Sequence, residues 1–155
     1  MNVNLSQHVA LVTGAARGIG KAIADLFALN GAHVVYTDVD LPVTKESAAA
    51  SANGEAMALD VTDASQVEAV VAAIVRQHGR LDIAVNNAGV NTLAHRVTID
   101  QFPQAEWERI LKVDLDGVFL VSRAVAQVMR RQKAGRIINI CLLYTSPSPR
   151  DRQKS

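Results

Sequence analysis

Cysteine is almost absent from this 155-residue sequence, which contains Cys141 and no other. One cysteine excludes a framework of internal disulfide bonds and favours a reducing compartment. The sequence also lacks any apolar run near the ~18 residues that a membrane-spanning helix requires. Its first residues, MNVNLSQHVALV, have neither the basic region nor the cleavage site of a signal peptide. We therefore expect a cytoplasmic protein that does not enter a membrane.

An excess of charge of one sign is missing as well. The 16 lysine and arginine residues nearly balance the 15 aspartate and glutamate residues, which leaves a net charge of +1. Three of the basic residues and one of the acidic residues fall within residues 141–155, so residues 1–140 hold 13 basic and 14 acidic residues. This balance offers no electrostatic footprint for nucleic acid. The hydrophobic fraction of 49% indicates instead a globular domain with a real core.

Continuous apolar runs alternate with stretches of helical periodicity along residues 1–140. We expect strands at residues 9–13, 33–37, 55–59, 81–85 and 136–140. We expect helices at residues 18–30, 43–52, 64–78 (with Asp63 as N-cap and Gly79 as the stop) and 104–133. This order predicts an α/β fold, a doubly wound parallel sheet of Rossmann type with helices on both faces. Such folds bind ligands beyond the carboxyl ends of their strands.

The glycine-rich segment TGAARGIG follows the first predicted strand and contains Gly14, Gly18 and Gly20. Glycines suit a tight turn in which the backbone approaches a pyrophosphate and the next helix packs close to the strand. The free N–H groups at the start of that helix can then hold phosphates. An ordinary strand-to-helix turn is the alternative, because the spacing is G-x-x-x-G-x-G.

Acidic residues follow the second and third predicted strands. Asp38 lies 18 residues beyond Gly20, near the ~20 expected for an acid that accepts hydrogen bonds from the adenosine ribose. A carboxylate there repels a 2′-phosphate, so we expect NAD rather than NADP; a solvated surface acid is the alternative. Asp60 and Val61 of ALDVTD stand where a carboxylate can accept from an adenine amino group.

The segment NNAG, residues 86–89, follows the fourth strand and offers two amides before two small residues. A larger side chain there would collide with a cofactor lying flat against the backbone, although the segment alone is also an ordinary turn.

These four segments together resemble the cofactor-binding half of a short-chain dehydrogenase/reductase, over about residues 5 to 140. The resemblance implies an oxidoreductase with a nicotinamide cofactor and a small alcohol or carbonyl substrate. It also implies that the helix from Gln104 packs against a second subunit in a homodimer or homotetramer; burial in a single core is the alternative. The cofactor-binding residues that it implies are Gly14, Arg17, Gly18, Ile19, Gly20, Asp38, Asp60, Val61, Asn87, Ala88 and Gly89.

The sequence departs from the family at two places. In VDLDGVF, residues 113–119, Asp114 stands where the family has an asparagine that holds a water of the proton relay. Asp114 can still accept from such a water, and a capped or bent turn near Gly117 is the alternative. The family also places a serine and a Tyr-x-x-x-Lys motif after the fifth strand. The lysine lowers the pKa of the tyrosine, whose ordinary value near 10 is too high for a base.

Neither of these catalytic elements is intact in residues 141–155. Tyr144 has Ser148 four residues later, and Pro147 and Pro149 would break the required helix. The eleven residues CLLYTSPSPRD back-translate without mismatch into a transposon-end sequencing adapter. We therefore expect an incomplete NAD(P)-binding domain at residues 1–140, truncated after the fifth strand, a non-native or disordered tail at residues 141–155, and an inactive chain. A non-catalytic dinucleotide-binding or regulatory module with a genuine tail is the alternative.

Metal and substrate sites have weaker signals. The four histidines, His8, His33, His78 and His95, show no metal-ligand spacing, and we expect them at the surface or in loops without a metal. Residues 90–103 are expected to border the substrate. Their polar content favours a polyol or sugar-type alcohol, with a 3-oxoacyl thioester as the alternative.

Overall fold

The computed structural model describes residues 3–92 and 97–140, and the predictions for residues 141–155, Tyr144 included, lie outside this part of the chain. Five parallel strands form one sheet with the order β3-β2-β1-β4-β5. The strands are β1 (Val9–Thr13), β2 (His33–Asp38), β3 (Gly54–Ala58), β4 (Ile83–Asn86) and β5 (Arg136–Asn139). From β1 to β3 the strands are added on one side of β1, whereas β4 and β5 are added on its other side. This reversal of strand order between β1 and β4 is the switch point at which doubly wound folds bind their ligands.

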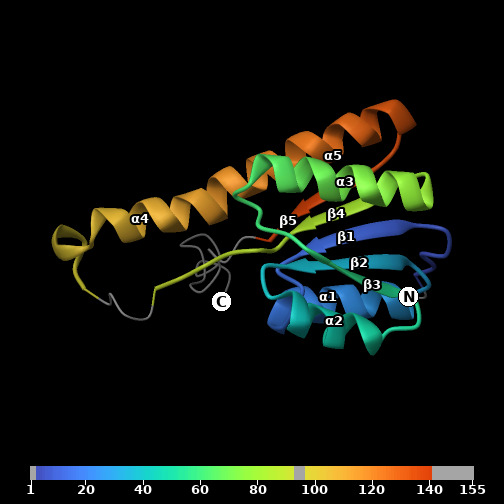
Figure 1. Cartoon of the computed structure of the whole chain (residues 1–155), viewed down its shortest axis with the longest axis horizontal. Helices are drawn as coiled ribbons and strands as arrows, with labels where there is room; N and C mark the ends of the chain where they lie inside the picture. Colours follow the sequence, from blue (N-terminus) through green and yellow to red (C-terminus); the bar gives the residue numbers. More distant parts are fainter. Residues whose placement is uncertain (1–2, 93–96, 141–155) are drawn as a thin grey trace, which may run out of the picture.

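Helices cover both faces of this sheet. In Figure 1, α1 (Gly18–Leu29) and α2 (Leu41–Ala49) lie below it, whereas α3 (Ala64–His78) and α5 (Val118–Gln132) lie above it. The predicted doubly wound α/β arrangement is therefore confirmed. No helix among the described residues is long and apolar enough to span a membrane.

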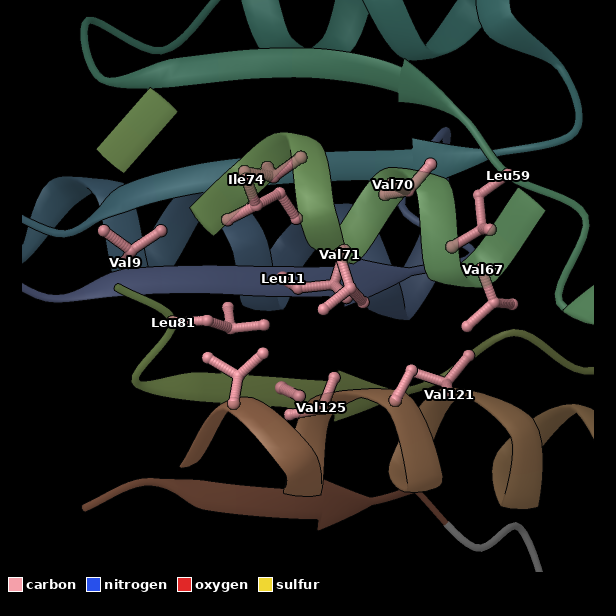
Figure 2. Close-up of a cluster of buried hydrophobic side chains, with 14 of the residues drawn as sticks. Val9, Leu11, Leu59, Val67, Val70, Val71, Ile74, Leu81, Val121 and Val125 are labelled. Carbon is pink, nitrogen blue, oxygen red and sulfur yellow. The ribbon is translucent and has the colours of Figure 1, made fainter. Parts of the chain in front are cut away.

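The core has two layers because successive side chains of a strand face opposite sides of the sheet. Val9 and Leu11 of β1 belong to the cluster below α3 and α5, whereas Ala10 and Val12 belong to the cluster against α1. Figure 2 shows side chains from α3 and α5 meeting over β1 and β4. Residues from all of these elements are fully or almost fully buried, including Leu11, Val67, Ile74, Val85, Val121 and Val125.

The sequence signals for helix ends agree well with the structure where polar caps are present. The Asp63 carboxylate accepts hydrogen bonds from the N–H groups of Ser65 and Gln66, and Gly79 ends α3 with a φ of 75°. Helix α2 begins earlier than predicted, at Leu41, because the Asp40 carboxylate caps it by accepting from the Val43 N–H at 3.3 Å. Strand β3 is shifted by one residue from its predicted position.

The predicted long helix from Gln104 is interrupted. It consists of α4 (Gln104–Leu111), a π-helical turn η2 (Lys112–Gly117) and α5, which follow one another along a single rod in Figure 1. The backbone of Gly117 packs against Val61, since a Cβ atom built on Gly117 would lie 2.6 Å from Val61 Cγ2. Neither one regular helix nor the alternative of a capped or bent turn near Gly117 describes this segment, because a π-helical turn ends at Gly117. Helix α4 extends beyond the sheet, and Trp107 is 51% exposed.

Asp82, just before β4, ties the amino ends of three strands together. Its carboxylate accepts from the Val9 N–H at 2.9 Å and from Arg80 at 2.7 and 2.8 Å, and its backbone carbonyl accepts from the Arg136 N–H. Burial on its own would raise the pKa of Asp82, but the hydrogen bonds from Arg80 and Val9 outweigh burial and lower it.

Candidate functional site

The glycine-rich turn joins β1 to α1 at the carboxyl edge of the sheet. Gly18 has a φ of +60°, which favours glycine, and among the described residues no atom outside its own helical turn and its chain neighbours lies within 4 Å of where its Cβ would be. Gly20 is required for packing, because a Cβ there would lie 2.3 Å from the Gly14 carbonyl oxygen. The N-cap of α1, Arg17, makes no side-chain capping hydrogen bond, and no acidic side chain occupies the first turn. The helix start is therefore available to an anion.

Asp38 closes one side of this turn. Its Oδ2 accepts from the Ala16 N–H at 3.3 Å, and its Oδ1 accepts from the Asp40 N–H at 3.1 Å. The carboxylate of Asp38 therefore lies beside the glycine-rich backbone, as its place after the second strand predicts.

The side chain of Arg17 is 72% exposed and pairs with Asp40 Oδ2 at 2.7 Å. This ion pair could not be predicted from sequence, because its two members are 23 positions apart in the chain.

Asp60 and Val61 follow β3 and line one pocket together with Gly14, Asp38 and Gly89. Oδ1 of Asp60 accepts from the N–H and hydroxyl of Thr62 at 2.9 and 2.8 Å, whereas its Oδ2 has no partner among the described residues.

The pocket has a volume of about 150 Å³. Whole small-molecule sites usually enclose ~300–1,000 Å³, so this pocket is smaller than a typical complete ligand site.

Asn87 and Thr13 hold the ends of β4 and β1 together. The Thr13 hydroxyl accepts from the N–H groups of Asn87 and Ala88, both at 3.0 Å, and the Asn87 amide donates to the carbonyls of Thr13 and Gly14. Asn87 is thus a positioning residue for the glycine-rich turn. Thr13 is a site residue that the sequence analysis missed, since as the last residue of an apolar run it was assigned only to the strand.

Gly89 is unlike the glycines of the turn. A Cβ built on Gly89 would lie 3.5 Å from Asp114 Oδ1, which is an ordinary van der Waals distance, and its φ is not in the left-handed region. The chain itself therefore has room for a side chain at this position, which lines the pocket.

Asp114 faces the segment that follows Gly89. Its Oδ1 accepts a hydrogen bond from the Val90 N–H at 2.8 Å and so fixes the loop that leaves β4. An asparagine oxygen would accept the same bond, which explains how aspartate is accommodated at this position. The arrangement gives Asp114 a structural partner in the chain.

The described residues contain one tyrosine, and it is unsuited to act as a base. Tyr36 is fully buried within the sheet; burial, together with the hydrogen bond that its hydroxyl donates to Asp25, raises its pKa to about 12. The described part of the carboxyl edge thus offers backbone N–H groups and carboxylates for binding. It holds no tyrosine with a lysine beside it.

Two of the histidines, which were expected at the surface or in loops, belong instead to regular elements and are partly buried. His33 begins β2, His78 ends α3, and both are partly buried next to Glu55 of β3. The three side chains lie at the amino ends of the strands, on the opposite edge from the glycine-rich turn. Sequence spacing did not reveal them because the pairing of β2 with β3 brings them together.

Comparison with known proteins gives a consistent result. The family model described as short chain dehydrogenase matches residues 8–148. The chain is 42% identical over 144 residues to 3-oxoacyl-[acyl-carrier-protein] reductase FabG of Vibrio cholerae, covering 89% of this chain and 56% of that protein. It is 40% identical over 140 residues to galactitol 2-dehydrogenase of Agrobacterium fabrum, covering 89% of this chain and 54% of that protein. The chain thus spans about half the length of the curated relatives it matches.

Proposed function

The chain belongs to the short-chain dehydrogenase family, and we propose that the carboxyl edge of its sheet binds NAD(H) for hydride exchange with an alcohol or carbonyl substrate. The observation that carries this proposal is the convergence of an uncapped helix start, the Asp38 carboxylate and the Asp60 pocket on one edge. The residues proposed to hold the cofactor are Gly14, Arg17, Gly18, Ile19, Gly20, Asp38, Asp60, Val61, Asn87, Ala88 and Gly89.

The phosphates are proposed to lie at the start of α1. Residues in the first turn of a helix have N–H groups without intrahelical acceptors, and the helix dipole adds a partial positive charge there. The open space in front of Gly18 leaves room for a pyrophosphate to approach the backbone.

The preference for NAD over NADP follows from the charge beside Asp38. Asp38 and Asp40 carry two negative charges, and Arg17, paired with Asp40, supplies one positive charge. This corner is therefore net negative, so a 2′-phosphate would be repelled, whereas two ribose hydroxyls would find a carboxylate acceptor.

The adenine is proposed to occupy the pocket lined by Asp60 and Val61. Oδ2 of Asp60 is available to accept from an exocyclic amino group, and Val61 offers an apolar wall supported from behind by Gly117. Asn87 keeps the glycine-rich turn in place, and Gly89 leaves space for a flat ring to pass.

The chemistry is supplied by the nicotinamide, which accepts or donates a hydride when bound. The described residues bind and orient; Tyr36, with its raised pKa, is excluded as the proton-transfer group. We therefore propose that these 155 residues bind the dinucleotide but do not catalyse its oxidation or reduction. The substrate is proposed to be an alcohol or carbonyl of the polyol or the 3-oxoacyl class, and both classes occur among the names of the relatives.

A homodimer or homotetramer built on the α4–η2–α5 rod is also proposed. Trp107, Leu115 and Phe119 of this rod are 51%, 60% and 60% exposed. Phe119→Glu is expected to shift the chain toward the monomer in sedimentation velocity. Leu29→Glu, at an 83% exposed position on α1, is the control and should leave the distribution unchanged. A wild-type chain that remains monomeric at high concentration contradicts this proposal.

Calorimetric titration with NADH and NADPH tests the function itself. We expect one NADH per chain, weaker binding of NADPH, and no oxidation of NADH with a panel of ketones and 3-oxoacyl thioesters. Tighter binding of NADPH would overturn the assignment of Asp38. Turnover with any substrate would refute the proposed inactivity of the 155 residues.

A further inference from the structure

We propose that His33, Glu55 and His78 form a site for a divalent transition-metal ion, with Zn²⁺ as the best match. These are the residues that the structure brings together at the amino ends of β2 and β3, beside the end of α3 (Figure 1). Two imidazoles and one carboxylate are a known ligand set for zinc, which leaves a fourth position for water.

The distances between the ligand atoms suit such an ion. His78 Nε2 lies 2.9 Å from Glu55 Oε1, His33 Nε2 lies 3.7 Å from the same oxygen, and one ligand atom from each residue falls within a 4.8 Å cluster. Zinc-to-nitrogen bonds of ~2.0–2.1 Å in a tetrahedron place neighbouring ligand atoms about 3.3 Å apart. The two separations from Glu55 Oε1 lie on both sides of that value, and the ligand atoms of all three residues lie within 4.8 Å of one another.

The ion pair between His78 and Glu55 does not account for the position of the His33 ring nitrogen. Its Nε2 atom is buried and has no hydrogen-bond partner among the described residues. A buried nitrogen without a partner is costly, whereas an ion held by Glu55 and His78 would give it one. The His33 and His78 rings already lie against one another, with centroids 4.1 Å apart, which sets both nitrogens toward the same carboxylate.

Gln77 is proposed as a positioning residue for this site. Its side-chain nitrogen donates to Glu55 Oε2 at 2.7 Å, which orients the carboxylate so that Oε1 faces the histidines. Hydrogen bonds of this kind to metal ligands fix their geometry and raise affinity. The side chain of His33 is 36% exposed although its Nε2 atom is buried, so a movement of the imidazole ring would be needed for the ion to enter.

The ion would act as a structural link. It would join β2, β3 and α3 at the edge of the sheet opposite the glycine-rich turn, so it would stabilise the fold without contacting the proposed dinucleotide. Metal binding is thus expected to raise the melting temperature and to leave the NADH dissociation constant unchanged.

The test is a titration of the whole, tag-free chain with Co²⁺ and Zn²⁺ after removal of metal by chelation. We expect one Co²⁺ per chain with the visible bands of a low-symmetry site, displacement by Zn²⁺, and a rise in melting temperature that a chelator reverses. The wild-type titration decides the matter even where variants fail to fold. Absence of saturable binding at one ion per chain overturns the proposal.

Variants then assign the ligands. His33→Gln, Glu55→Gln and His78→Gln should each weaken binding at least tenfold, and Gln77→Leu should weaken it roughly 10–100-fold. His8→Gln is the matched control for a histidine outside the cluster, and Cys141→Ser removes the only thiol. Binding that persists unchanged in the first three variants, or that is lost with Cys141→Ser, contradicts the assignment.

Discussion

Asp38 is the residue proposed to determine the choice between NAD and NADP. Its carboxylate is fixed beside the glycine-rich turn by the N–H groups of Ala16 and Asp40. Replacing Asp38 with serine removes the charge proposed to repel a 2′-phosphate, so the expected preference for NADH over NADPH should fall at least tenfold, or about 1.4 kcal/mol. Calorimetry with both nucleotides measures this ratio. The control is Asp63→Ser. It removes a carboxylate that caps α3 outside the proposed site, and serine can still cap the helix, so this ratio should not change.

A substitution at Gly89 is expected to affect cofactor binding much more than the stability of the fold. The chain has room for a methyl group at this position, so Gly89→Ala should change the free energy of unfolding by less than about 1 kcal/mol. The same methyl group would stand in the proposed path of the cofactor, and NADH binding should weaken more than tenfold. Unfolding and binding are measured on the same preparation. A variant that keeps full NADH affinity would remove Gly89 from the site.

The sequence predicted the order of strands and helices, and with it the positions of the proposed site residues along the carboxyl edge. Gly18, Asp38 and Asp60 lie where strand ends place them. In contrast, the hydrogen bonds of Thr13 to residues 87 and 88 depend on the pairing of β1 with β4. Local pattern does not contain that information, because the register between distant strands is set by tertiary packing.

At the scale of elements, the π-helical turn η2 ends at Gly117, which makes a close contact with the segment after β3. Gly117 lies against Val61, and an added Cβ would be 2.6 Å from Val61 Cγ2. Gly117→Ala should therefore lower the free energy of unfolding by roughly 1–3 kcal/mol, as overpacking does. Val61→Ala removes Cγ2, the atom that the new Cβ would overlap. The double variant should therefore lose less free energy of unfolding than the sum of the losses in the two single variants. Urea denaturation of all four proteins gives this coupling, and strict additivity would contradict the contact.

Elements with strong local signals were predicted closely. Helix α3 has a polar cap in Asp63, a glycine stop and a regular apolar face, and both its ends agree with the structure. The π-helical turn was missed because the rod from Gln104 to Gln132 keeps enough apolar periodicity to predict one helix. The histidine cluster was missed because its members come from three elements that meet only in the folded sheet.

At the scale of the whole molecule, Asp82 joins the amino ends of three strands and makes stability depend on pH. Its folded pKa is lowered, so its contribution is present above the unfolded value of ~3.9 and is lost as pH falls through the folded value. Unfolding in urea between pH 7 and pH 3 should therefore show a loss of stability on the acid side. In Asp82→Asn, stability should be lower at pH 7 and this acid-side loss should be smaller. An identical pH profile in both proteins would contradict the role of Asp82.

The arrangement of the whole sheet places the two proposed sites at opposite edges. The glycine-rich turn, Asp38 and Asp60 share the carboxyl edge, whereas His33, Glu55 and His78 share the amino edge. Ligands of the two sites should consequently perturb separate sets of residues.

Chemical-shift mapping of the ¹⁵N-labelled chain with NADH tests dinucleotide binding most directly. We predict that the largest changes fall on the amides of Gly18, Ile19 and Gly20 at the start of α1, followed by those of Asp38 and Gly89. The amide chemical shifts of residues at the amino edge of the sheet should not change. Absence of any change at saturating NADH, or changes confined to surfaces away from the carboxyl edge, would contradict the proposed function.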